Sequence, residues 1–214
     1  MYPWITHTFN TIKGICPHGC TYCYMRRFPQ KPVRFDSKEL NTDLGSENFI
    51  FVGSSCDMFA DAIPDKWIMD TLSYCESFTG NKYLFQSKNP TRIAEHRLFL
   101  PDNSVICTTI ETNRYYEQMA DAPHPKIRAS AMELLFSFPR EFDKYVTIEP
   151  IMELDLPEMV ELIKMCNPKQ VNIGADSGNN HLPEPSKDKL LALIEELQKF
   201  TVIAQKRNVG RLLK

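Results

Sequence analysis

The chain has 214 residues, of which 43% are hydrophobic and 24% are charged, and its formal net charge is −2. These values exclude a disordered chain and a global basic field for nucleic acid, and they favour a single domain over residues 1–214. No apolar run approaches the roughly 18 residues of a membrane helix and no signal peptide opens the chain, so we expect a soluble cytoplasmic protein without a membrane partner.

Short runs rich in β-branched and aromatic residues predict strands along the whole chain. In chain order they cover residues 8–12, 49–53, 83–87, 104–111, 145–149, 170–174 and 201–204. Apolar residues at helical spacing predict helices between them. Their stripes are Ile68, Leu72, Cys75 and Phe78; Ile127, Ala131, Leu134 and Leu135; Met159, Leu162, Ile163 and Cys166; and Leu190, Leu193, Ile194 and Leu197, the last preceded by Ser186 as N-cap.

Repeated alternation of strands and helices predicts an α/β fold with a parallel sheet that right-handed crossovers curl toward a full or partial barrel. Polar residues follow the strand cores, at residues 53–57, 86–89, 109–113, 149 and 176–179. Because sites in parallel α/β folds form at the carboxyl ends of the strands, we expect a functional site along this rim.

Three cysteines near the start of the chain carry the strongest chemical signal, namely Cys16, Cys20 and Cys23. Pro17 and Gly19 predict a tight turn here, on which three thiolates can hold three irons of a [4Fe-4S] cluster and leave the fourth iron open. A structural zinc site completed by His18 or His7 is the alternative. Besides an enzyme, the chain can therefore be a zinc-stapled nucleic-acid-binding module, or an iron–sulfur electron carrier or redox sensor.

The cysteine spacing, with Tyr22 just before the last cysteine and a strand before the loop, resembles the signature of the radical S-adenosylmethionine (SAM) superfamily. Residues 14–24, 54–59, 148–150 and 174–178 are similar to runs in small uncharacterised phage-type radical SAM proteins. The spore photoproduct lyase group is a more distant likeness. The expected fold is then a partial (βα)6-type TIM-like barrel with parallel strands.

The resemblance implies that Cys16, Cys20 and Cys23 bind a [4Fe-4S] cluster whose open iron chelates the amine and carboxylate of SAM. A reductant such as flavodoxin or ferredoxin would supply the electron that cleaves SAM. The resulting 5′-deoxyadenosyl radical would take a hydrogen atom from a substrate. Cys56, at the same rim, could return a hydrogen atom as a catalytic thiol, although a buried inert cysteine is the alternative. Cys75, Cys107 and Cys166 fall on apolar positions and are expected in the core.

The resemblance also implies cofactor-binding residues. Tyr22 would lie near adenine, and Gly53, Ser54 and Ser55 would replace the family's Gly-Gly-Glu run, whose glutamate this chain lacks. Thr109 and Glu111 would contact the ribose or the methionine amine, and Arg128 would hold the SAM carboxylate. Gly174 and Asp176 would lie at the adenine. For Tyr22, Glu111 and Arg128 the alternatives are simple packing, a structural salt bridge or cap, and a surface arginine.

The substrate is predicted only by class. Two basic clusters would suit a phosphate-bearing substrate if they converge, and otherwise they form a solvated surface. They are Arg26, Arg27, Lys31 and Arg34, and Lys206, Arg207 and Arg211. A nucleotide or nucleic acid is the first hypothesis and a peptide the second. Candidates for substrate contacts at the rim are Asp57, Ser87, Lys88, Glu149 and Asn179, each of which can instead serve as a structural hydrogen-bonding group.

Overall fold

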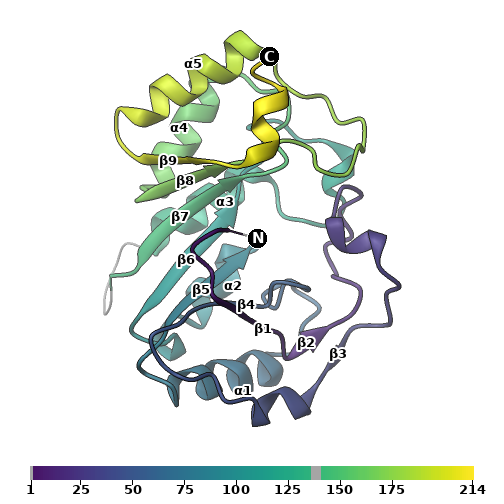
Figure 1. The fold of residues 1–214 in the computed structure, drawn as a ribbon, viewed down its shortest axis with the longest axis vertical. Coiled ribbons are helices and arrows are strands. Elements are labelled where there is room, and N and C mark those ends of the chain that lie inside the picture. Colours follow the sequence, from purple (N-terminus) through teal and green to yellow (C-terminus); the bar gives the residue numbers. More distant parts are fainter. Residues whose placement is uncertain (1, 136–140) are drawn as a thin grey trace.

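The computed structural model describes residues 2–135 and 141–214. Its centre is a seven-stranded sheet of β1 (His7–Phe9), β4 (Phe49–Val52), β5 (Lys82–Ser87), β6 (Ser104–Thr109), β7 (Asp143–Ile148), β8 (Gln170–Ile173) and β9 (Val202–Gln205). All neighbouring pairs are parallel and follow one another in chain order, with β1 and β9 at the edges. The sheet is curved and open (Figure 1). The predicted α/β fold with parallel strands is confirmed.

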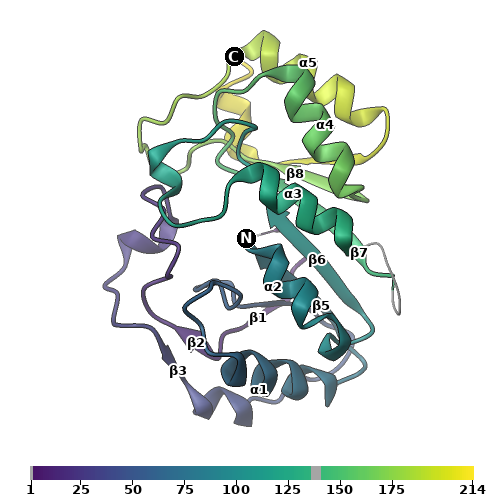
Figure 2. The ribbon, with the colours of Figure 1, turned by 180° about the vertical axis from the view of Figure 1, so that it is seen from behind.

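The helices cover the outer face of the sheet, as the view from behind shows (Figure 2). They are α1 (Asp65–Glu76), α2 (Pro90–Glu95), α3 (Pro125–Leu134), α4 (Leu156–Cys166) and α5 (Lys187–Gln198). Four of them pack in sequence along the sheet, since α2 contacts α3, α3 contacts α4 and α4 contacts α5. Because each helix returns the chain to the start of the next strand, all strand carboxyl ends meet at one rim.

Three of the predicted helical stripes are buried as expected, in α1, α4 and α5, except that Phe78 lies beyond the end of α1 and is only partly buried. Ser186 is the N-cap of α5, because its side chain accepts a hydrogen bond from the Lys189 amide. The prediction for α3 was wrong in part, since Ile127 and Leu134 are exposed. The buried face of α3 carries Arg128 instead, and a charged residue on the core side defeats a search for apolar periodicity.

The first crossover, from β1 to β4, contains the cysteines and differs from the prediction of one strand over 8–12. The chain leaves the sheet after Phe9 and forms β2 (Ile12–Lys13), which pairs antiparallel with β3 (Arg34–Phe35). Gly14 closes this loop with a φ of +111°, and a Cβ there would lie 2.6 Å from the Lys31 carbonyl oxygen. Only glycine fits such a close approach with positive φ. Two 3₁₀ turns follow, η1 (Tyr24–Arg27) and η2 (Ser37–Asn41).

The core lies mainly between the sheet and the helices. A smaller cluster contains Tyr2 together with Leu84, Val105 and Cys107 of the sheet, and Tyr2 stacks on Trp4 with ring centroids 4.8 Å apart. The Tyr2 hydroxyl also hydrogen-bonds with Thr147 on β7 (2.6 Å), so the N-terminal segment fills part of the concave side. No helix in the described parts of the chain is long and apolar enough to span a membrane.

Candidate functional site

The cysteine loop lies between β2 and η1 and turns sharply at each cysteine. The Gly19 amide donates to the Cys16 carbonyl (3.1 Å) and the Cys23 amide to the Cys20 carbonyl (3.3 Å). The loop packs on the segment of η4 (Glu117–Met119), where the buried Cys20 thiol donates to the Met119 carbonyl at 3.4 Å. Cys16 and Cys23 are partly exposed, whereas Cys20 is buried.

The donor set of this loop fits an iron–sulfur cluster, since one loop carries three free thiols. Within residues 2–135 and 141–214, no group of three His, Cys, Asp or Glu side chains converges closely enough to hold a single metal ion. A cubane cluster places irons and sulfides between its thiolates, so its ligands do not need to converge on one point. His18, the alternative zinc ligand, has its Nε2 atom bonded to Asp57.

Cys56 follows β4 and lies beside Cys16. The neighbouring Cys56 thiol lowers the pKa of Cys16 by hydrogen bonding, whereas burial raises the pKa of Cys20 and that of Cys23. Cys56 is 2% exposed and belongs to the main core, on which Cys16 also packs, while Cys20 and Cys23 pack in a separate cluster. The Cys16 end of the loop therefore faces the rim cysteine that the sequence singled out as a catalytic candidate.

Asp57, the next residue, binds the cysteine loop to the rim. Its Oδ2 atom accepts from His18 Nε2 (2.9 Å), Ser87 Oγ (3.0 Å) and the Lys88 amide (2.8 Å). Burial acts to raise the pKa of Asp57, but the bond and charge of His18 outweigh it and hold that pKa below its usual value. Asp57, Ser87 and Lys88 are thus brought together, as their rim positions predicted.

Glu111 forms the second junction between the loop and the rim. It is fully buried beyond the end of β6, and its Oε1 atom accepts from the Tyr22 hydroxyl (2.5 Å) and from Lys88 Nζ. Its Oε2 atom accepts from Arg128 Nη1 (2.7 Å), which also donates to the Thr109 carbonyl (2.9 Å). The structure therefore gathers four predicted cofactor-binding residues, since Tyr22 and Arg128 bind Glu111 directly and Thr109 joins it through Arg128.

The charges around Glu111 do not balance. Burial acts to raise its pKa, but the charges of Arg128 and Lys88 outweigh this effect and lower the pKa of Glu111 to about 2. The carboxylate thus stays ionised beside two cations. Arg128 is 0% exposed, and its Nη2 atom has no hydrogen-bond partner among the described residues. A buried donor without a partner is costly, so this corner has both charge and hydrogen-bonding capacity to spare for an anion.

The Gly53–Ser55 turn is held by a residue that the sequence analysis missed. Asn10 Oδ1 accepts from Ser54 Oγ (3.2 Å), from Ser55 Oγ (3.1 Å) and from the Ser55 amide (3.0 Å). Gly53 has a φ of +75° and donates to the Phe9 carbonyl. Asn10 directly follows β1, so the general pattern of polar residues after strand ends would have found it if β1 had been ended at Phe9.

Gly174 and Glu149 meet at the rim, directly after β8 and β7. A Cβ at position 174 would lie 2.6 Å from the Glu149 carboxyl group, so glycine leaves room for this side chain. Glu149 pairs with Lys206, whose Nζ atom lies 4.5 Å from the Tyr2 ring centroid. Glu149 follows β7, which pairs with the β6 strand that leads to Glu111, and the two strands are in register at Thr109 and Thr147. Hydrogen bonds link polar side chains of the inner sheet, since Gln86 donates to Thr109 and Asn172 donates to Thr147.

Asp176 organises the loop after β8. Its carboxylate accepts from the amides of Gly178 (2.9 Å) and Asn180 (2.6 Å), and its carbonyl accepts from Arg211 Nη2 (3.0 Å). The adjacent Ser177 carbonyl accepts from Arg27. The two basic clusters therefore converge on this loop through Arg27 and Arg211, while the exposed Asn179 lies within it.

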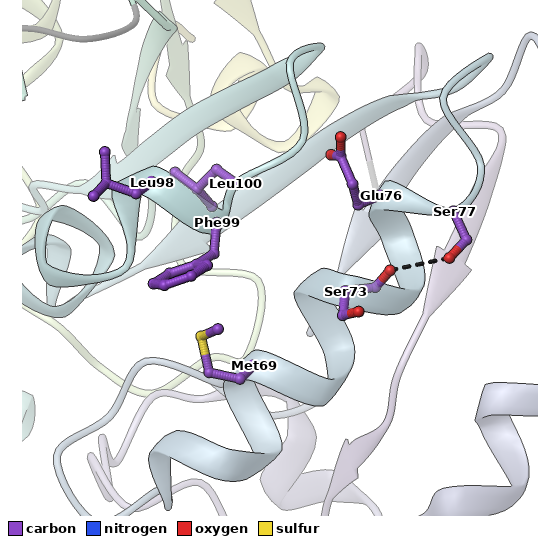
Figure 3. Close-up of a pocket in the computed structure, with 7 residues that line it drawn as sticks. All are labelled: Met69, Ser73, Glu76, Ser77, Leu98, Phe99 and Leu100. Atoms are coloured by element: carbon purple, nitrogen blue, oxygen red, sulfur yellow. Dashed lines mark hydrogen bonds between the residues drawn. The ribbon is translucent and has the colours of Figure 1, made fainter.

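A surface pocket lies away from this rim. It measures about 450 Å³ and lies between α1 and the segment around η3 (Arg97–Phe99), as Figure 3 shows. It is lined by Met69, Ser73, Glu76, Ser77, Leu98, Phe99 and Leu100. These residues include none of the site candidates, and they sit at the end of α1 that leads toward the start of β5.

The fold is shared with solved structures of spore photoproduct lyase. A cysteine-to-serine mutant of that enzyme has a TM-score of 0.68 at 11% identity, over 96% of this chain and 78% of the other. A cysteine-to-alanine mutant with dinucleoside spore photoproduct has a TM-score of 0.57 at 12% identity, over 88% of this chain and 60% of the other. No protein-family model matches the sequence, and no curated protein is significantly similar. At such low identity the likeness shows the fold alone.

Proposed function

We propose that the chain is a radical SAM enzyme in which Cys16, Cys20 and Cys23 hold a [4Fe-4S] cluster. The observation that carries the proposal is the position of three free thiols on one loop at the carboxyl-end rim of an open parallel sheet. The same fold occurs in spore photoproduct lyase, whose group the cysteine motif also resembles. When bound, the cluster and SAM supply the 5′-deoxyadenosyl radical.

The excess positive charge around Glu111 supports a binding place for the SAM carboxylate. Lys88 and Arg128 bring two positive charges to the single negative charge of Glu111, and one Arg128 nitrogen is without a partner in the described structure. A ligand carboxylate would balance this charge. The residues proposed to bind the rest of SAM lie around the same rim. They are Tyr22, Gly53, Ser54, Ser55, Thr109, Gly174 and Asp176.

Cys56 is proposed as the catalytic thiol that returns a hydrogen atom. It lies beside Cys16, one of the three proposed cluster ligands, and it is buried. Burial keeps bulk water from the thiol, which favours hydrogen-atom transfer over side reactions. By contrast, Cys75, Cys107 and Cys166 lie in the core away from the loop.

The proposed substrate is a nucleotide or nucleic acid. Arg27 and Arg211 converge on the loop after β8, and the exposed Arg26 and Arg207 lie near them in sequence. Such a group of cations suits phosphate oxygens. The spore photoproduct lyase structure with a dinucleoside ligand has the same fold, which agrees with this class. The electron would come from a small reductant protein of the flavodoxin or ferredoxin kind.

Anaerobic reconstitution tests the function directly. The protein is loaded with iron and sulfide, reduced with dithionite and mixed with SAM, and 5′-deoxyadenosine is measured by chromatography. We expect the nucleoside from the wild-type protein and from Cys56→Ala, because the thiol acts after cleavage. A fully loaded protein that gives no 5′-deoxyadenosine would contradict the proposal, and zinc without iron or sulfide would favour a zinc module.

A further inference from the structure

The Asp57 carboxylate joins three segments that are far apart in sequence. It lies in the loop after β4, and it binds His18 of the cysteine loop and both Ser87 and Lys88 after β5. Its second oxygen, Oδ1, accepts from the Phe59 amide at 3.0 Å. With four donors on two oxygens and a side chain that is 11% exposed, the carboxylate is already satisfied by the protein. This arrangement is typical of a structural junction and leaves little capacity for a substrate.

His18 is the member of this junction that comes from the cysteine loop. It lies between Cys16 and Cys20 and is 4% exposed. Since the Asp57 carboxylate can only accept, His18 Nε2 must carry the proton of their 2.9 Å bond. The bond therefore fixes the cysteine loop directly to the residue that follows Cys56.

Each partner of this bond is close in sequence to a cysteine. Cys56 directly precedes Asp57. Cys16 precedes His18 by two residues and packs on the core cluster that contains Cys56. We propose that His18 and Asp57 are a positioning pair that holds the Cys56 thiol against the Cys16 end of the cysteine loop. The role of this arrangement in catalysis rests on the proposed function, whereas the arrangement itself does not.

Thiol–disulfide exchange in the metal-free protein tests the arrangement. Oxidised glutathione is attacked by the partly exposed Cys16, which forms a mixed disulfide and releases one reduced glutathione. A neighbouring thiol then attacks the Cys16 sulfur, forms the internal disulfide and releases the second glutathione. The ratio of internal to mixed disulfide, measured by peptide mass spectrometry, reports how close the second thiol is held and depends little on the reactivity of Cys16.

Three variants separate positioning from general structure. His18→Leu removes the donor, whereas His18→Gln keeps an amide nitrogen near the position of Nε2. His96→Leu is the matched control, because His96 is also buried (7% exposed) and lies 3.5 Å from the Asp65 carboxylate, but it is on the outer side near α2. We expect the Cys16–Cys56 disulfide to dominate in the wild-type protein. The ratio should fall about tenfold in His18→Leu and stay within about twofold in His18→Gln and His96→Leu.

Two results would overturn the proposal. One is a wild-type protein in which Cys20 or Cys23, rather than Cys56, resolves the mixed disulfide. The other is an unchanged ratio in His18→Leu, or in His18→Phe, which keeps an aromatic ring but no donor, if His18→Leu does not fold. Since the assay contains no iron or SAM, these results are independent of radical chemistry. A protein that passes this test but yields no 5′-deoxyadenosine after reconstitution would refute the proposed function and leave the positioning pair intact.

Discussion

The Tyr22 hydroxyl donates to the Glu111 carboxylate at 2.5 Å, and both side chains are buried. Tyr22 lies between the second and third cysteines of the loop, and Glu111 follows β6. Together with the bond between His18 and Asp57, this contact anchors the cysteine loop to the rim at two points. The loop geometry is therefore set by side chains that lie between the cysteines, before any ligand binds.

Replacing Tyr22 by phenylalanine should destabilise the protein. Tyr22→Phe keeps the ring but removes a donor to a buried carboxylate, so we expect the free energy of unfolding to fall by about 1.5–3 kcal/mol in a urea titration. Tyr24→Phe is the control, because its hydroxyl donates to the Ser54 carbonyl at an exposed position and its loss should cost less than about 1 kcal/mol. Equal effects of the two substitutions would show that the Tyr22 bond adds no stability.

The pKa of Glu111 predicts a pH dependence of stability. Its pKa is lowered to about 2 in the folded protein and lies near 4.5 when unperturbed, so the unfolded state binds a proton first as the pH falls. The ionised carboxylate therefore contributes stability in full above about pH 4.5, and this contribution is lost between about pH 4.5 and pH 2. Glu111→Gln should cost about 3–5 kcal/mol at neutral pH, because it leaves the buried Arg128 and the partly buried Lys88 without their anion.

The measurement is the difference in unfolding free energy between the wild-type protein and Glu111→Gln at several pH values. This difference should be largest above about pH 4.5 and shrink toward pH 2. Glu196→Gln serves as the control, because Glu196 pairs with Lys199 on the exposed side of α5 and the difference should stay near zero throughout. A difference for Glu111→Gln that stays constant with pH would be inconsistent with the lowered pKa.

The sheet could be predicted from the sequence because its strands are short apolar runs bounded by polar residues, as in 83–87 and 170–174. The helix α2 was missed because it spans only six residues, Pro90–Glu95, and shows less than two turns of periodicity. The face of α3 was misassigned because Arg128 points inward. Its burial is explained by Glu111, a partner 17 positions away, which no local pattern can reveal.

The candidate site could also be predicted only in part from the sequence. The rule that polar residues gather at strand carboxyl ends correctly brought Asp57, Ser87 and Lys88 together. It did not predict which rim residues bind one another, since Glu149 pairs with Lys206 and not with the Glu111 group. His18 was considered only as a zinc ligand, because its contact with Asp57 spans 39 positions and depends on the path of the whole crossover.

The cluster assignment predicts different results for two cysteine variants. Cys20→Ala should abolish cluster assembly, measured as iron and acid-labile sulfide per chain after anaerobic reconstitution. Cys166→Ala should load normally, because Cys166 lies on α4 with its thiol bonded to the Leu162 carbonyl in the core. Cys166→Ala also controls for the loss of a buried thiol, since Cys20 and Cys166 are both buried. Equal loss of iron in the two variants would contradict the assignment.

The basic residues at the loop after β8 predict a salt-dependent interaction with nucleic acid. Binding of a fluorescent single-stranded oligonucleotide should weaken steeply with salt, with a slope in log–log form of about −0.7 for each phosphate contact. Arg26→Ala and Arg207→Ala, both at exposed positions, should each reduce the magnitude of the slope by about one contact. Lys164→Ala is the matched control, because this exposed lysine at the end of α4 pairs with Glu161 and lies 5.9 Å from the Phe200 ring centroid. If binding is insensitive to salt, or if Lys164→Ala lowers the slope as much as Arg207→Ala does, the converging cations do not bind phosphates.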